Sequence, residues 1–189
     1  MDNNINASNN KRNSGIVTAT SYSGSGGNLT GITTGKILQV QSVVKTDQFS
    51  STSTSFVDIT GLSINITPSS TNSKILVLAQ IAVSGEDAGT GIMLDRDGTE
   101  PLKADADGSR QRFTMIGNYA GYASSSSYSN GSNHISFLDS PNTTSQVTYK
   151  LKAKTRSANT FRVNITRYTG DDTNSSVGTS TLTVMEVAA

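Results

Sequence analysis

His134 is the chain's one histidine and therefore the first candidate for chemistry. A Ser–His–Asp triad would have to use it, because no second imidazole is present to act as the base. Serine and aspartate are so frequent that their presence does not support a triad. His134 falls within Asn133–Leu138, which we expect to be a strand and not an active-site loop. We interpret it as a structural residue and predict a protein that is not an enzyme and has no catalytic residues.

The acidic residues form two short motifs, Asp95-x-Asp97-Gly98 and Asp105-x-Asp107-Gly108. Each resembles part of a calcium loop, but the terminal glutamate of such a loop is missing. Two hairpin turns explain the Asp-Gly pairs better. Glycoside hydrolysis would need two carboxyl groups at a set separation across a groove, which nothing in the sequence supports. With no cysteine for a thiolate ligand or nucleophile, we expect no metal and no cofactor.

The best candidate for recognition is the polar segment Gly117–Gly131, which carries Tyr119, Tyr122 and Tyr128 among Ser, Gly and Asn. Tyrosine in such a background gives a large contact area at a low entropy cost, and its ring stacks on sugar faces. We predict these tyrosines as receptor-binding residues for a host-surface glycan. The alternatives are an ordinary surface loop and a loop packed at a subunit interface.

Three lysines, Lys150, Lys152 and Lys154, alternate along one predicted strand. A solvated outer face or a protected edge strand is the simplest interpretation. A patch that contacts glycan or lipopolysaccharide is the alternative.

These side chains must be positioned by β-strands, and the segment Lys74–Val83 (KILVLAQIAV) organises the rest. It is apolar on both faces of an extended chain, which predicts a strand in the middle of a sheet with cover on both sides. A short buried helix is the competing interpretation. The β-branched residues and the flanking turn signals, Ser69–Ser73 and Ser84-Gly85, favour the strand.

Other segments repeat the alternation of apolar and polar residues. In Lys36–Val44, Leu38, Val40 and Val44 share a face and predict a half-buried strand. Further strands are expected at 49–60, 62–67, 91–96, 111–116, 133–138, 147–155, 161–168 and 181–187. About eight to ten strands with frequent turn signals predict an all-β antiparallel sandwich of the jelly-roll type.

The composition limits the partners of the chain. Net charge is +1, which argues against a nucleic-acid partner, because phosphate binding needs clustered Lys and Arg. The first 36 residues hold no apolar stretch of the kind found in a signal peptide, and no transmembrane segment is visible, so we expect no membrane insertion.

Composition also divides the chain into residues 1–34, an extended N-terminal anchor or stalk, and residues 35–189, a knob domain. The first part is too poor in apolar residues to fold alone. Three copies wound together, or another protein, would have to cover its apolar side chains. The residues expected to anchor it are Ile16, Val17, Leu29 and Ile32.

Several stretches resemble one group of proteins, both in their amino-acid sequence and in their order along the chain. They are GKILQV at 35–40, FSSTSTSFVDITGLSINITPSSTNSKILVLA at 49–79, SFLDSP at 136–141, the TTSQVTYKLK strand at 143–152, and the ending TLTVMEVAA. Together they are similar to fibre-tip or head-fibre virion proteins of tailed bacteriophages, and residues 15–32 resemble the short β-repeats that precede such tips.

The resemblance implies a homotrimeric knob whose subunits look like the jelly rolls of tumour-necrosis-factor and complement-type heads. It further implies a structural protein on the virion surface, made in the host cytoplasm, attached to capsid, neck or tail proteins through its N-terminal segment and used for host adhesion. The alternatives are a capsid or neck decoration protein with a clamping N-terminal arm, and a glycan-degrading tailspike-like enzyme.

Overall fold

The computed structural model describes residues 36–86, 89–117, 131–171 and 173–189, and the regular structure in these ranges is entirely antiparallel β. They contain no helix, and so none long and apolar enough to cross a membrane. The strands are β1 (Ile37–Lys45), β2 (Phe49–Ser51), β3 (Val57–Ile66), β4 (Lys74–Gly85), β5 (Gly91–Arg96), β6 (Met115–Ile116), β7 (Gly131–Asp139), β8 (Val147–Lys154), β9 (Phe161–Val163) and β10 (Ser180–Val187).

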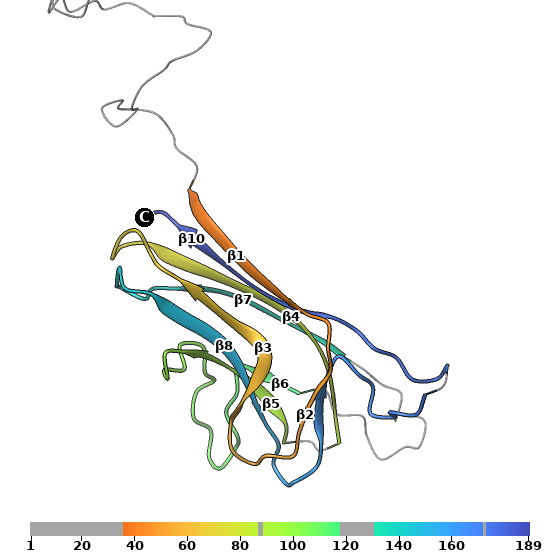
Figure 1. Cartoon of the computed structure of the whole chain (residues 1–189). Coiled ribbons are helices and arrows are strands. Elements are labelled where there is room, and N and C mark those ends of the chain that lie inside the picture. The colour runs from red at the N-terminus through yellow and green to blue at the C-terminus, as the bar shows by residue number, and fades with distance from the viewer. Residues whose placement is uncertain (1–35, 87–88, 118–130, 172) are drawn as a thin grey trace, which may run out of the picture. The chain divides into compact units, whose positions relative to one another are not determined.

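The strands pair in a nested order, as if one long hairpin had been rolled up. β1 pairs with β10, β3 with β8, β4 with β7 and β5 with β6. The roll forms two layers, a six-stranded sheet with β1, β10, β4, β9, β2 and β7, and a four-stranded sheet with β3, β8, β5 and β6 (Figure 1). Two packed antiparallel sheets with this nesting form a jelly roll, so the predicted fold class is confirmed.

The predicted organising strand is β4, and it lies inside the six-stranded sheet. One of its edges pairs with β10 and, at its far end, β9; the other pairs with β7. Its inward side chains are buried in the core: Ile75, Val77, Ala79, Ile81 and Val83. On the opposite face Leu76, Leu78 and Ala82 are only half-buried. The predicted cover is therefore present on one face of β4 and missing from the other within the described residues.

A buried polar cluster ties the two sheets together. Asp139, on β7, accepts a hydrogen bond of 2.6 Å from Arg96 and one of 2.7 Å from the Tyr149 hydroxyl, both on the four-stranded sheet. Burial and then the Asp139 carboxylate raise the pKa of Tyr149 far above its usual value, so the hydroxyl remains a donor. Among the described residues, every buried side-chain nitrogen and oxygen has a partner. The polar groups between the sheets are thus satisfied.

The structure corrects several strand predictions. Gly61 was expected to separate two strands, but β3 runs through it as a bulge, with φ of +83° at Gly61, a conformation that glycine adopts without strain. Asp97-Gly98 forms the predicted turn, with both φ angles positive. Asp107-Gly108, in contrast, lies in an exposed loop, and only Met115–Ile116 of the expected strand 111–116 is extended in a ladder.

The most informative correction concerns β1. Leu38, Val40 and Val44 were expected to face the core, yet they are 48%, 51% and 62% exposed. The inward positions of β1 instead pair with buried residues of β10, as Gln41 does with Val184 and Lys45 with Ser180. The apolar alternation is real, but it points away from the protein's own core.

Candidate binding surfaces

The outer face of the six-stranded sheet carries an uncharged surface made of three rows of paired residues. We call these positions the uncharged face. The first row is Val40, Met185, Leu76 and Leu138; the second is Ser42, Thr183, Leu78 and Ser136; the third is Val44, Thr181, Gln80 and His134. None of these positions holds Asp, Glu, Lys or Arg. The first row is apolar along its whole length, and its end residues, Val40 and Leu138, are each 51% exposed.

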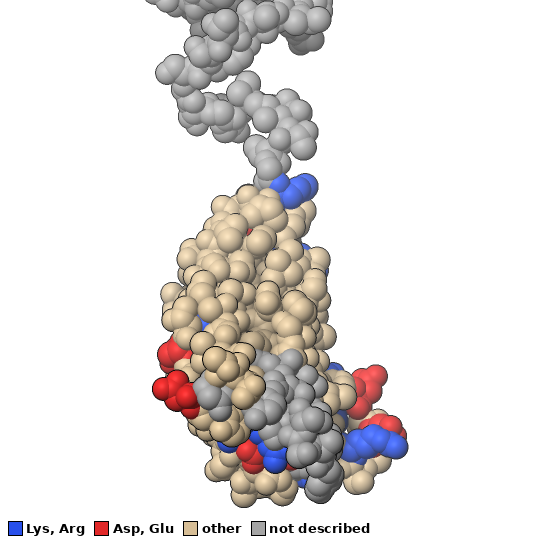
Figure 2. Space-filling model, turned by 90° about the vertical axis from the view of Figure 1, so that its right-hand side faces the viewer, with Lys and Arg blue, Asp and Glu red and all other residues tan. Residues whose placement is uncertain are grey.

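The outer face of the four-stranded sheet has the opposite character. Lys150 contacts Asp58 at 2.9 Å, and Lys152 contacts Asp95 at 3.2 Å. Figure 2 looks from the side on which β1, β10 and β4 lie in Figure 1, and its upper surface is almost entirely free of charged side chains, which gather toward the lower end. The outer face of the four-stranded sheet therefore carries charged side chains in ion pairs. The uncharged face of the six-stranded sheet instead presents mainly apolar, hydroxyl and amide groups.

His134 belongs to the uncharged face and not to a cluster of catalytic groups. It lies on β7, as predicted, paired with Gln80 of β4, and its side chain is exposed. Its row contains a valine, a threonine and a glutamine but no carboxylate. Together with Leu78 and Thr183 it lines a shallow depression of that face.

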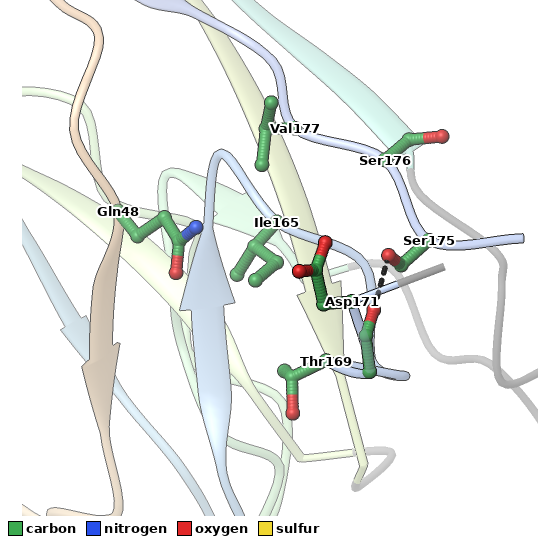
Figure 3. A pocket seen from close by; sticks show the side chains of 8 residues that line it. Gln48, Ile165, Thr169, Asp171, Ser175, Ser176 and Val177 are labelled. Carbon is green, nitrogen blue, oxygen red and sulfur yellow. Dashed lines mark hydrogen bonds between the residues drawn. The ribbon is translucent and has the colours of Figure 1, made fainter. Parts of the chain in front are cut away.

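A second surface, which we call the Thr169 groove, lies where β2, β9 and the segment after β9 meet. Three adjoining hollows share Thr169, and two of them also share Gln48 and Ile165. Figure 3 shows one of these two hollows. Besides these, the groove is lined by Phe49, Ser50, Ser51, Thr52, Ser53, Thr160, Arg162, Gly170, Asp171, Ser175, Ser176 and Val177. Hydroxyl and amide groups dominate this lining, with Ile165 and half-buried Phe49 as apolar parts.

The charge of the groove is nearly balanced. Arg162 donates to Glu86 at 2.6 Å, and the two side chains are 15% and 24% exposed. Burial raises the pKa of Glu86, but the hydrogen bonds from Arg162 and from the Thr160 N–H outweigh it, so the pKa lies below its usual value. Glu86 therefore stays ionised and compensates the guanidinium at neutral pH.

One buried residue, Asn164, holds the walls of the groove in place. Its φ of +63° ends β9 directly after Val163 and turns the chain. Its side-chain amide donates to the backbone carbonyls of Lys45 (2.9 Å) and Asp47 (3.0 Å), and its oxygen accepts from Ser180 (2.6 Å). The Asn164 side chain thus joins three segments by hydrogen bonds: the β1–β2 connection, the end of β9 and the start of β10.

The groove lies at the far end of the sandwich from the chain's first described residue. Lys36 and the C-terminus lie together, because the Ala188 N–H donates to the Lys36 carbonyl at 2.7 Å (Figure 1). From there the chain runs along β1 to β2, a path of roughly 40 Å for an extended strand. Gly131, which pairs with Val83, lies at the same far end.

The other residues that were predicted to bind a receptor or to anchor the chain are not described by the structure. Tyr119, Tyr122 and Tyr128 lie outside the described residues, as do the anchor residues Ile16, Val17, Leu29 and Ile32. The boundary at residue 35 likewise stays a prediction.

The acidic motif and the lysines have structural partners. Asp95 accepts from the Gly98 N–H at 3.1 Å, and Asp97 from the Thr148 N–H at 3.0 Å, so both carboxylates stabilise the turn. Strand β8, which carries the lysines, lies between β3 and β5, so the edge-strand interpretation is wrong. Lys154 lies over the Phe56 ring, 5.1 Å from its centroid.

Sequence reasoning missed the Thr169 groove and Asn164. The groove is assembled from small polar residues near positions 50 and 170, which are the commonest residue types of this chain. The alternation of Phe161, Val163 and Ile165 with polar residues gave no signal, because Asn164 stands at a polar position of that pattern. The one available hint was the residue type, since asparagine adopts positive φ more readily than most residues.

Comparison with known proteins identifies no family for this chain. No protein-family model matches the chain. No curated protein matches it either. Solved structures that match include infectious bursal disease virus, Gx strain (15% identity, TM-score 0.37), and the infectious bursal disease virus VP2 subviral particle (15%, TM-score 0.36). Each match covers 80% of this chain and 37% of the other, so the chain spans little more than a third of those proteins. At TM-scores below 0.5 this similarity supports no argument about fold or function.

Proposed function

We propose that this protein is a structural, non-enzymatic virion protein: a short homotrimeric fibre whose jelly-roll knob is displayed on the particle and adheres to the host surface. Three observations support the proposal. The sequence from Gly35 to Ala189 resembles phage fibre-tip and head-fibre proteins, and the fold is the jelly roll that this resemblance implies. The observation that carries the proposal is the uncharged face.

A face that surrounds a symmetry axis must avoid like charges, because residues beside the axis lie close to their own copies. The uncharged face meets this condition with apolar side chains and neutral hydrogen-bonding groups. Its apolar row across four strands is also a contiguous exposed patch, a feature that marks interaction sites on soluble proteins. Burial of Leu76, Leu78 and Val40 in an assembly would supply the cover that β4 and β1 lack in the single chain.

The size of the face can be compared with that of known interfaces. Its rows span five residues on each of four strands spaced about 4.8 Å apart, a flat area on the order of 300 Å². A standard interface buries roughly 800 Å² per partner, so the assembly would also have to bury surface beside this face. A closed ring is the usual way for identical subunits to bury such faces. We infer three copies because the sequence resemblance implies a trimer.

The arrangement of the ends fits a displayed knob. If residues 1–34 anchor the protein, the end near Lys36 points toward the particle, and the end with the Thr169 groove points away from it. Three sites on each trimeric knob and many fibres on each particle would let weak individual sites give strong attachment.

A particle from which the protein is absent tests the proposal. We expect virions lacking it to assemble but to adsorb poorly to host cells, and normal adsorption to return when the full chain is supplied. An antibody against the knob should decorate intact particles in negative-stain images. Normal adsorption without the protein would contradict adhesion and favour decoration, and release of reducing sugar by the purified chain would contradict a non-enzymatic role.

A further inference from the structure

We propose that the Thr169 groove binds an uncharged carbohydrate, specifically hydroxyl-rich sugar units of a surface polysaccharide. This inference rests on the proposed adhesive function for the source of the ligand, and it gives that function a site. It places recognition on described residues of β2, β9 and the segment after β9, separate from the tyrosines predicted from the sequence.

The groove has the volume of a ligand site. Its three hollows measure about 360, 680 and 120 Å³ and adjoin one another at Thr169. The two larger hollows fall within the range of roughly 300–1,000 Å³ that is typical of small-molecule sites. A chain of several sugar rings could therefore occupy the groove along its length.

The hydrogen-bonding groups match a polyol. Ser50, Thr52 and Thr169 present hydroxyls, each both a donor and an acceptor, and Gln48 presents an amide. Within the described ranges none of these four side chains makes a hydrogen bond to another protein group. Arg162 has five N–H donors, of which Glu86 takes one. The groove thus offers many neutral hydrogen-bonding groups. The one cationic residue of its described lining, Arg162, is already paired with a carboxylate and does not require an anionic ligand.

Other ligand classes fit less well. A phosphate or sulfate would need an uncompensated cation, but Arg162 is paired with Glu86. A metal ion would need several carboxylates, and Asp171 is the only acidic residue among the described residues that line the groove. An added peptide strand would have to pair along β2, which is only three residues long. An apolar ligand would contact few apolar side chains, because Phe49, Ile165 and Val177 are the large apolar residues of the described lining.

The site is also held rigid before binding. Asn164 fixes the backbone on both sides of the groove through its three hydrogen bonds, and Ile165 pairs with Val177 in an isolated bridge. Figure 3 shows Gln48, Thr169 and Asp171 around the same space, close to Ile165. A preorganised site loses less entropy on binding, which matters for a ligand recognised by weak, neutral contacts.

The experiment measures binding of the purified full chain to immobilised neutral polysaccharides (dextran, mannan, galactan and the host's own surface polysaccharide), with dextran sulfate as the anionic probe. The test variant is Gln48→Ala with Thr169→Ala, and the matched control is Gln111→Ala with Thr144→Ala, both exposed and outside the groove. We expect at least one neutral probe to bind, the groove variant to lose roughly tenfold or more in affinity, and the control to bind normally. Melting curves confirm that both variants fold.

Binding to no neutral probe, equal binding by the groove variant, or preference for dextran sulfate would overturn the inference. Particle adsorption, measured in parallel, separates this failure from failure of the proposed function. If particles with the groove variant adsorb normally while particles without the protein do not, adhesion stands and the groove is not its site. If particles without the protein adsorb normally, the proposed function itself fails.

Discussion

Replacing Asn164 by alanine tests how the groove end of the sandwich is held together. The side chain is fully buried and makes three hydrogen bonds, of 2.6, 2.9 and 3.0 Å. Each bond contributes about 1 kcal/mol, and the substitution leaves the Lys45 and Asp47 carbonyls without these donors. Alanine also tolerates the φ of +63° less well than asparagine does, which adds a further cost of up to about 1 kcal/mol. We expect a loss of about 3–4 kcal/mol.

The assay is urea unfolding of the full chain at neutral pH, followed by circular dichroism at one protein concentration, because the assembly we propose would make apparent stability depend on concentration. Asn164→Gly also removes the hydrogen bonds, but glycine adopts the positive φ without strain, so this variant should lose less stability than Asn164→Ala. The control Asn65→Ala, exposed on β3, should change stability by no more than about 0.5 kcal/mol. A loss below about 1 kcal/mol for Asn164→Ala would refute the role assigned to this side chain.

Three further predictions concern stability. Glu186 is buried, yet the hydrogen bonds that it accepts from Ser69, Gln39 and Ser73 outweigh burial and lower its pKa from 4.5 to about 2. The stabilisation of the fold by this ionised carboxylate is therefore fully present above pH 4.5 and is lost as the pH falls toward 2. Urea titrations should show wild type losing more stability than Glu186→Gln between these pH values, and parallel losses would contradict this. Tyr149→Phe should cost about 1–2 kcal/mol in the same assay, and no loss would mean that the Asp139 contact is not stabilising. Gly61→Val should lower the melting temperature, since φ there is +83°, and an unchanged melting curve would argue against the bulge.

The sequence predicted most strands because burial on one side of a sheet leaves a period of two. Lys74–Gly85 and Val147–Lys154 follow it closely and were placed to within about two residues. Of the positions with positive φ, the Asp-Gly turn at 97–98 was predicted, but Gly61 and Asn164 were missed, since side-chain polarity carries little information about φ. Gly61 was taken as a break and proved to be a bulge, and Asn164 ends a strand that the apolar pattern extended to residue 168.

The candidate surfaces were less predictable than the fold. The alternation in β1 revealed an apolar face but not its direction, because burial by a partner and burial by the protein's own core produce the same pattern. On the inward side of β1, Gln41 and Lys45 are polar, so the polarity of this strand does not follow the core. The Thr169 groove combines common polar residues brought together only by folding, so no local pattern marks it.

The molar mass of the full chain in solution tests the central claim most directly, namely that the uncharged face joins identical copies. Sedimentation equilibrium at micromolar concentration should give about three times the chain mass of 19.8 kDa. Val40→Lys with Leu138→Lys, both half-exposed in the single chain, should shift the mass toward one chain without loss of β-structure, while Asn65→Lys on the other sheet should remain trimeric. A wild-type mass of one chain, or a trimer unaffected by the paired lysines, would contradict the account.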